Sequence, residues 1–125
     1  MNVVDSSGWL EYFADGPNAS AFARPIEAIQ SLIVPTLSLF EVFKRVSQQR
    51  SEDDALRAIA VMEQAKVVDL DRATALEAAR LAIQHGIAMA DSVMLATAQR
   101  HRAPLGPGFG FRRVAGDKVL CKPIA

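Results

Sequence analysis

The chain has 125 residues, half of them hydrophobic, so it can build one core but leaves little room for a second domain. Its formal net charge is zero, which excludes a general positive field for nucleic acid and confines any such contact to local patches. Its single cysteine, Cys121, excludes an intramolecular disulfide and fits a reducing cytoplasm. The sequence predicts neither a signal peptide nor a membrane span.

Short apolar runs and helical patterns alternate along the chain. The apolar runs predict strands at residues 1–4, 31–34 and 67–70. The helical patterns begin after Asp5 and then cover residues 19–30, 38–49, 51–64, 72–85 and 89–100, with Ser38 as a cap and Gly86 as a stop. This alternation predicts an α/β fold in one domain over residues 1–125. Its central parallel sheet has about four to five strands, flanked by helices on both faces.

Acidic residues stand where the predicted strands end and the predicted helices begin. Asp5 directly follows the first strand, and Glu41 lies one turn into the helix after the second strand. Asp91 lies in an otherwise apolar stretch at the start of the last helix. Because the carboxyl ends of parallel strands meet at one edge of a sheet, we expect these carboxylates to converge. Mg²⁺ and Mn²⁺ favour such oxygen ligands, so the pattern predicts a divalent metal site.

Each acid also has a simpler interpretation. Asp5 and Asp91 could be caps at the starts of helices. Glu41 could form an ion pair with Lys44 or Arg45 on a helix surface. The apolar neighbours of Glu41 and Asp91 favour the metal site, because an enclosed carboxylate is costly unless it is paired or binds a cation.

Three segments resemble the motifs of a known family. Residues 3–13 (Val-Val-Asp-Ser-Ser-Gly-Trp-Leu-Glu-Tyr-Phe) resemble the opening of PIN domains of the toxin class found in VapBC toxin–antitoxin pairs. Residues 34–42 (Val-Pro-Thr-Leu-Ser-Leu-Phe-Glu-Val) resemble the second motif, and residues 90–98 (Ala-Asp-Ser-Val-Met-Leu-Ala-Thr-Ala) resemble the third. The order and spacing of the three motifs agree with this family.

The resemblance implies an endoribonuclease that depends on Mg²⁺ or Mn²⁺. Asp5, Glu41 and Asp91 would be the catalytic metal ligands, with Ser6 supporting them from behind. It also implies a cytoplasmic homodimer that is silenced by a cognate antitoxin protein. One alternative is an inactive PIN-fold module that only binds its antitoxin. Another is a nuclease that acts on structured DNA.

The tail of the chain departs from the family pattern. A Leu-Trp-Thr-x-Asp motif ordinarily supplies a fourth acid after the last helix, but here no acid occurs between Leu105 and Asp117. Codons for an ordinary family ending, Leu-Trp-Thr-Gln-Asp-Ser-Asp-Phe-Glu-Gly-Leu-Pro-Gly-Ile-Lys-Tyr-Phe-Ala, can be chosen so that a shifted frame spells Gly108–Cys121. We therefore hypothesise that residues 105–121 are frame-shifted. Asp117 is a candidate substitute ligand, or simply a turn residue.

Basic and aromatic residues complete the set of candidates. The basic clusters could contact RNA or be solvated helix faces; one contains Lys44, Arg45 and Arg50, and the other is Arg100-His101-Arg102. Aromatic residues at helical spacings are expected to pack in the core or against a second copy of the chain rather than to stack on bases. These are Trp9, Tyr12, Phe13, Phe40 and Phe43.

Overall fold

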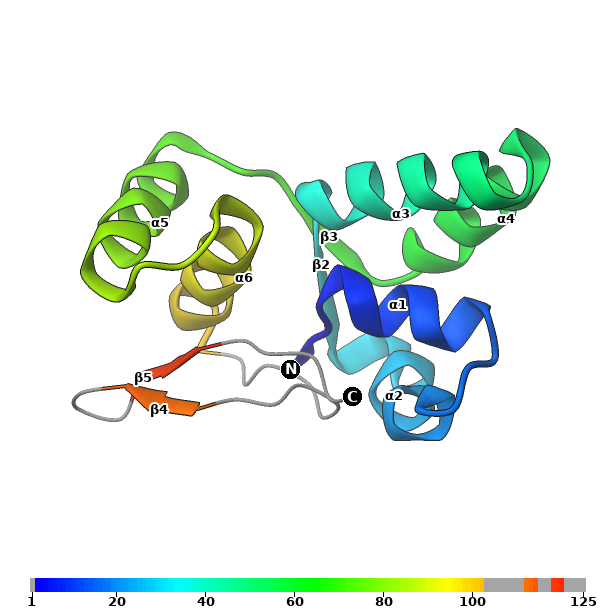
Figure 1. The fold of residues 1–125 in the computed structure, drawn as a ribbon, viewed down its shortest axis with the longest axis horizontal. Coiled ribbons are helices and arrows are strands. Elements are labelled where there is room, and N and C mark those ends of the chain that lie inside the picture. The colour runs from blue at the N-terminus through cyan, green and yellow to red at the C-terminus, as the bar shows by residue number, and fades with distance from the viewer. Residues whose placement is uncertain (1, 103–111, 115–117, 121–125) are drawn as a thin grey trace.

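A parallel sheet lies between two groups of helices in the computed structural model, which describes residues 2–102, 112–114 and 118–120 (Figure 1). Its strands are β1 (Asn2–Val3), β2 (Leu32–Pro35) and β3 (Lys66–Val68), in the order β1-β2-β3. The central strand β2 is buried along its whole length. In the register, Val3 is paired with Ile33 and Val34 with Val67. The α/β architecture with a parallel sheet is therefore confirmed.

The number of strands differs from the prediction of four to five in one parallel sheet. The described residues form three parallel strands and a separate antiparallel pair, β4 (Arg112–Val114) with β5 (Lys118–Leu120). The difference has a topological reason. Strands separated by so short a connection pair antiparallel, because a parallel pair needs a crossover of a dozen or more residues.

One group of helices covers the sheet face that carries Val4, Leu32 and Val34. It consists of α1 (Ser6–Phe13), α2 (Ala19–Glu27), α3 (Thr36–Gln49) and α4 (Glu52–Met62), with the short 3₁₀ helix η1 (Ile29–Ser31) before β2. Their side chains form the larger core cluster, which includes Trp9, Phe22, Ile26, Val42, Ala58 and Met62. Successive strand residues point to opposite faces, so Val3 and Ile33 face the other layer.

The second group of helices covers that other face. Val3 and Ile33 pack against Met94 and Ala98 of α6 (Met89–Arg100). Helix α5 (Arg72–His85) packs on α6 in turn and contributes Ala78 and Leu81 to a further core cluster. Figure 1 shows α5 and α6 on the opposite side of the sheet from α1 to α4. The prediction of helices on both faces is thus confirmed. No helix in the described part of the chain is long and apolar enough to cross a membrane.

Local capping chemistry explains several helix ends. Asp71 accepts a hydrogen bond from the Thr74 amide at 2.8 Å and begins α5, and Gly86 ends it with a φ of +63°. Ser51 caps α4 through the Asp54 amide in the same way. These signals are visible in the sequence, and α5 and α6 have the bounds predicted from it.

Helices α2 and α3 depart from the predicted bounds. Helix α3 begins at Thr36, with Pro35 as its N-cap, so Ser38 is not a cap. Ser38 is instead fully buried and its hydroxyl donates to the Met94 sulfur at 3.7 Å. Helix α2 ends at Glu27, where the backbone of Ala28 leaves the helical conformation at ψ 60°, and its internal Pro25 costs it one hydrogen bond to the preceding turn.

Candidate active site

Asp5 links the first strand to the first helix. It follows β1, has an extended backbone with φ −67° and ψ 158°, and is the N-cap of α1. Its carboxylate accepts hydrogen bonds from the Ser6 amide at 2.6 Å and from the Ser7 hydroxyl at 3.2 Å. The capping interpretation is therefore correct for Asp5. It does not exclude a ligand role, because a carboxylate has about four lone-pair positions.

Glu41 is brought beside Asp5 by Ser6. Helix α3 begins two residues before the predicted start, so Glu41 lies in its second turn and is partly buried. The Ser6 hydroxyl donates to Oε1 of Glu41 at 2.5 Å, across 35 residues of sequence. This short hydrogen bond fixes the start of α1 against α3. Ser6 thus contacts one of the three predicted ligands directly, and its supporting role stays a prediction.

Asp91 approaches the same place from the other side of the sheet. It is the third residue of α6, whose N-cap is Ala88, so the capping interpretation is wrong for Asp91. Burial raises the pKa of its carboxyl, and the negative charges of Asp5 and Glu41 raise this pKa further. Asp91 therefore lies close enough to Asp5 and Glu41 for their charges to act on it.

One pocket of about 470 Å³ contains all three carboxylates. Among the described residues, its other charged lining residues are Lys44 and Arg45, one turn beyond Glu41 on α3. The remaining lining residues come from α1, α3 and α6; they are Ser6, Ser7, Leu10, Phe40, Gln48 and Ala90. The arrangement combines acidic oxygens for a cation with basic groups for a phosphate.

The donor set fits a hydrated Mg²⁺ or Mn²⁺ ion. Within the described residues, no group of three or more acidic, histidine or cysteine side chains is arranged so that it could hold a metal ion. Mg²⁺ does not need three protein ligands, because it keeps several waters and usually binds through one or two carboxylates. The crowded charge that raises the pKa of Asp91 is what a divalent cation would neutralise.

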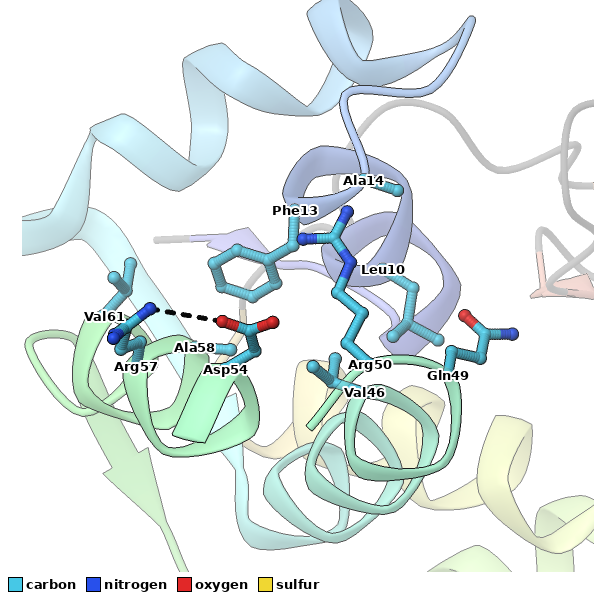
Figure 2. A pocket seen from close by; sticks show the side chains of 10 residues that line it. All are labelled: Leu10, Phe13, Ala14, Val46, Gln49, Arg50, Asp54, Arg57, Ala58 and Val61. Atoms are coloured by element: carbon cyan, nitrogen blue, oxygen red, sulfur yellow. Dashed lines mark hydrogen bonds and ion pairs between the residues drawn. The ribbon is translucent and has the colours of Figure 1, made fainter. Parts of the chain in front are cut away.

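The two basic clusters have different surroundings. Lys44 and Arg45 line the carboxylate pocket, but Arg50 lines a separate apolar pocket between α1, α3 and α4 (Figure 2). Arg100 and His101 line a third pocket together with Asp69 and Asp71. Only the first two residues of the α3 cluster are therefore placed to contact a substrate at the carboxylates.

Several pocket residues, Phe40 and Gln48 among them, were not singled out for this site from the sequence. Phe40 was expected in the core or in a dimer, yet it is 61% exposed and lines the carboxylate pocket, so the core assignment is wrong. Gln48 lies two turns beyond Phe40 on the same helix. The spacing Phe40, Lys44, Gln48 was the available signal, because residues four apart share a helix face. Asp117 and most of the atypical tail lie outside the described residues.

Comparison with known proteins gives a consistent result. The family model described as PIN domain matches residues 3–115. A toxin–antitoxin complex from Klebsiella pneumoniae superposes with a TM-score of 0.70 at 19% identity, covering 94% of this chain and 89% of that one. A toxin from Mycobacterium tuberculosis, described as cleaving the sarcin-ricin loop, has a TM-score of 0.71 at 14% identity, covering 82% and 85%.

A third structure agrees with these two. The VapBC2 complex of Rickettsia felis, bound to a DNA fragment from its promoter, has a TM-score of 0.66 at 13% identity and covers 83% of this chain and 84% of that one. No curated protein sequence matches the chain. At these identities the structural likenesses establish the fold.

Proposed function

We propose that this chain, which belongs to the PIN domain family, is an endoribonuclease that hydrolyses RNA phosphodiester bonds with Mg²⁺ or Mn²⁺. We also propose that it is the toxin of a VapBC-type toxin–antitoxin pair. The observation that carries the proposal is the convergence of Asp5, Glu41 and Asp91 on one pocket. Two of the similar structures contain toxin–antitoxin complexes, and a third is described as a sarcin-ricin-loop-cleaving toxin.

The three carboxylates are proposed to hold the ion. When bound, the ion would activate a water molecule and stabilise the charge that develops on the attacked phosphate. Ser6 restricts the rotation of Glu41 through its hydrogen bond to one of the two carboxylate oxygens. The caps formed by Asp5 hold the start of α1 in place beneath the pocket.

Lys44 and Arg45 are proposed to bind the RNA backbone. They are exposed, and both line the pocket beside Glu41. Because the chain carries no net charge, affinity for RNA has to come from such local groups. Arg45 can bind a phosphate through two parallel hydrogen bonds, whereas Lys44 acts as a point charge.

The partners follow from the same proposal. A cognate antitoxin would occupy the active-site groove and silence the enzyme in the cytoplasm. A homodimer is supported by α5, where Leu76 and Ile83 are exposed by 56% and 85% on a helix of the outer layer. Exposed apolar side chains of this size on one helix suit contact with a second copy.

Cleavage of a mixed RNA pool with Mg²⁺, Mn²⁺ or EDTA, with DNA tested in parallel, examines the proposal. We expect metal-dependent cutting of RNA that falls at least about a hundredfold in Asp5→Asn and Asp91→Asn. Glu77→Gln is the matched control, because this carboxylate lies on α5 and pairs only with exposed Arg80 among the described contacts. Equal activity in all these variants would contradict the proposal, and preferential cutting of DNA would support the DNA alternative.

A folded protein that binds an antitoxin but does not cut RNA would support the inactive module. In that case the tail would be the first candidate cause of the lost activity, because the family's fourth acid is missing from it. The intact mass of protein purified from its natural source tests the frame-shift hypothesis. A mass that agrees with the printed sequence rules out a sequencing error.

A further inference from the structure

Phe40 is the one aromatic residue among the exposed large hydrophobic side chains of the described chain. Its side chain is 61% exposed, whereas Trp9 is 0% and Phe22 is 4% exposed. It also lines the pocket that contains Asp5, Glu41 and Asp91. An aromatic ring that contributes little to the core therefore stands at the carboxylate site.

The geometry of α3 places the ring on the side of the helix that borders this pocket. The helix buries Ser38 and Val42, while Phe40 stays outside the core. Lys44 lies one turn further, with Nζ 5.9 Å from the centre of the Phe40 ring. This separation is at the outer limit of a cation–π contact, so it holds Lys44 only weakly. The ammonium group is therefore free to turn towards a phosphate.

We propose that Phe40 is a stacking platform for an unpaired base beside the phosphodiester bond that is cut. This inference rests on the proposed function, because it takes RNA to be the ligand. A base has a flat apolar face that can cover the ring, and Lys44 or Arg45 can contact the adjoining phosphate. A base in a duplex is already stacked on its neighbours, so the platform favours single strands and loops.

The surroundings of the ring favour a base over an apolar anchor from a protein. The pocket is lined mainly by charged and polar side chains, with Leu10 and Ala90 as its other apolar members. A protein anchor needs a dry apolar surround to contribute much to affinity. Stacking of a base needs only one face of the aromatic ring. It tolerates charged groups at the edge of the ring, because a nucleotide itself carries a charged phosphate beside its base.

The test is fluorescence titration of short single-stranded RNA that contains 2-aminopurine, with Asp91→Asn as the background so that the RNA stays intact. We expect quenching of 2-aminopurine on binding. Adding Phe40→Ala should remove the quenching and weaken binding by about 5- to 150-fold. Phe40→Trp should restore both, whereas Phe40→Leu should behave like Phe40→Ala. Leu56→Ala is the control, since Leu56 is similarly exposed but lies on α4.

Unchanged binding and quenching in Phe40→Ala, or full rescue by Phe40→Leu, would overturn the inference. The same holds if no variant binds RNA, or if Phe40→Ala disturbs only dimerisation or antitoxin binding. The assay involves no turnover, so its result is independent of cleavage. Quenching that depends on Phe40 in an enzyme that cuts nothing would support the platform and contradict the nuclease. Cleavage of RNA by the wild type, together with unchanged binding and quenching in Phe40→Ala, would support the nuclease and contradict the platform.

Discussion

Helix α3 borders two pockets of opposite character. Its residues Glu41, Lys44 and Arg45 line the carboxylate pocket, while Val46 and the C-cap residue Arg50 line the apolar pocket. The apolar pocket has a volume of about 270 Å³, and Phe13 and Val61 line it from α1 and α4 (Figure 2). Its charged pair, Asp54 and Arg57, is matched in charge and exposed.

The two pockets differ in how their residues affect the stability of the fold. In the carboxylate pocket, burial and then the charges of Asp5 and Glu41 raise the pKa of Asp91, which opposes folding at neutral pH. Around the apolar pocket, apolar side chains are packed together and Asp54 is paired with the opposite charge of Arg57. A site that violates local stability rules while its surroundings obey them is where function is expected. The following predictions test this difference.

The largest effect on stability is expected from the larger core cluster, which lies among α1 to α4. Met62 in α4 is fully buried, so Met62→Ala should lower the free energy of unfolding by about 2–5 kcal/mol through a cavity in the core. Urea unfolding monitored by circular dichroism measures this loss. Cleavage per folded molecule should not change, because Met62 does not line the carboxylate pocket. A stable variant that has lost activity would show that the two regions are not separate.

A divalent metal ion bound in the carboxylate pocket should stabilise the folded protein. At a concentration about a hundred times its Kd, Mg²⁺ or Mn²⁺ should raise the free energy of unfolding by about 2.7 kcal/mol, since it binds only the folded chain. Urea unfolding with metal or with EDTA measures the gain. Asp91→Asn should remove most of it, and Glu77→Gln should keep it. An equal gain in both variants would assign the metal effect to another part of the chain.

The pH dependence of stability should have opposite signs at Asp91, in the carboxylate pocket, and at Asp71, in a third pocket. The pKa of Asp91 is raised above 3.8, so the folded state keeps a proton that the unfolded chain has lost. Its contribution to stability therefore falls as pH rises through the window between the unfolded and the folded pKa. Metal-free Asp91→Asn should lack this fall and be the more stable protein near pH 7. Urea unfolding between about pH 4 and pH 7 compares the two proteins.

Asp71 is the internal contrast for that experiment. Hydrogen bonds from Thr74 lower its pKa, and the positive charges of Arg100 and His101 contribute less. Its contribution is present above the ordinary pKa of 3.8 and is lost as pH falls through the lower folded value. Asp71→Asn should therefore alter stability in the direction opposite to Asp91→Asn at neutral pH. A matching direction would contradict the assigned causes.

The smallest effect is expected at the rim of the apolar pocket. The Arg57 side chain is 79% exposed and pairs with Asp54 at 3.2 Å. Arg57→Ala should cost less than about 0.5 kcal/mol, because water and salt screen such a pair. Urea unfolding with and without added salt measures it. A loss above about 1 kcal/mol would mean that this pair contributes more than surface pairs do.

Sequence reasoning succeeded where a signal is local. The Asp71 cap and the Gly86 stop fix α5, and the alternation of strands and helices indicates the parallel sheet. It failed where the outcome depends on partners distant in sequence. Ser38 has the chemistry of a cap, but contact with Met94 from α6 gives it a buried position instead. Periodicity likewise placed Phe40 on a helix face without showing that nothing in the core covers it.

The candidate site shows the same division. That Asp5, Glu41 and Asp91 would converge follows from strand and helix order, and all three line one pocket. The hydrogen bond between Ser6 and Glu41 joins residues 35 positions apart, so no local pattern predicts its geometry. The separation of Arg50 from Lys44 and Arg45 also depends on how α1 and α4 pack on α3.

Binding of Mn²⁺ to the intact protein tests the central claim most directly, because it depends on neither the RNA target nor turnover. Electron paramagnetic resonance of free Mn²⁺ follows the titration in the wild type, Asp91→Asn, Glu41→Gln and the control Glu77→Gln. The account predicts saturable binding that weakens at least about tenfold in the first two variants and is unchanged in the control. Equal affinity in all four proteins would contradict a metal site formed by these carboxylates.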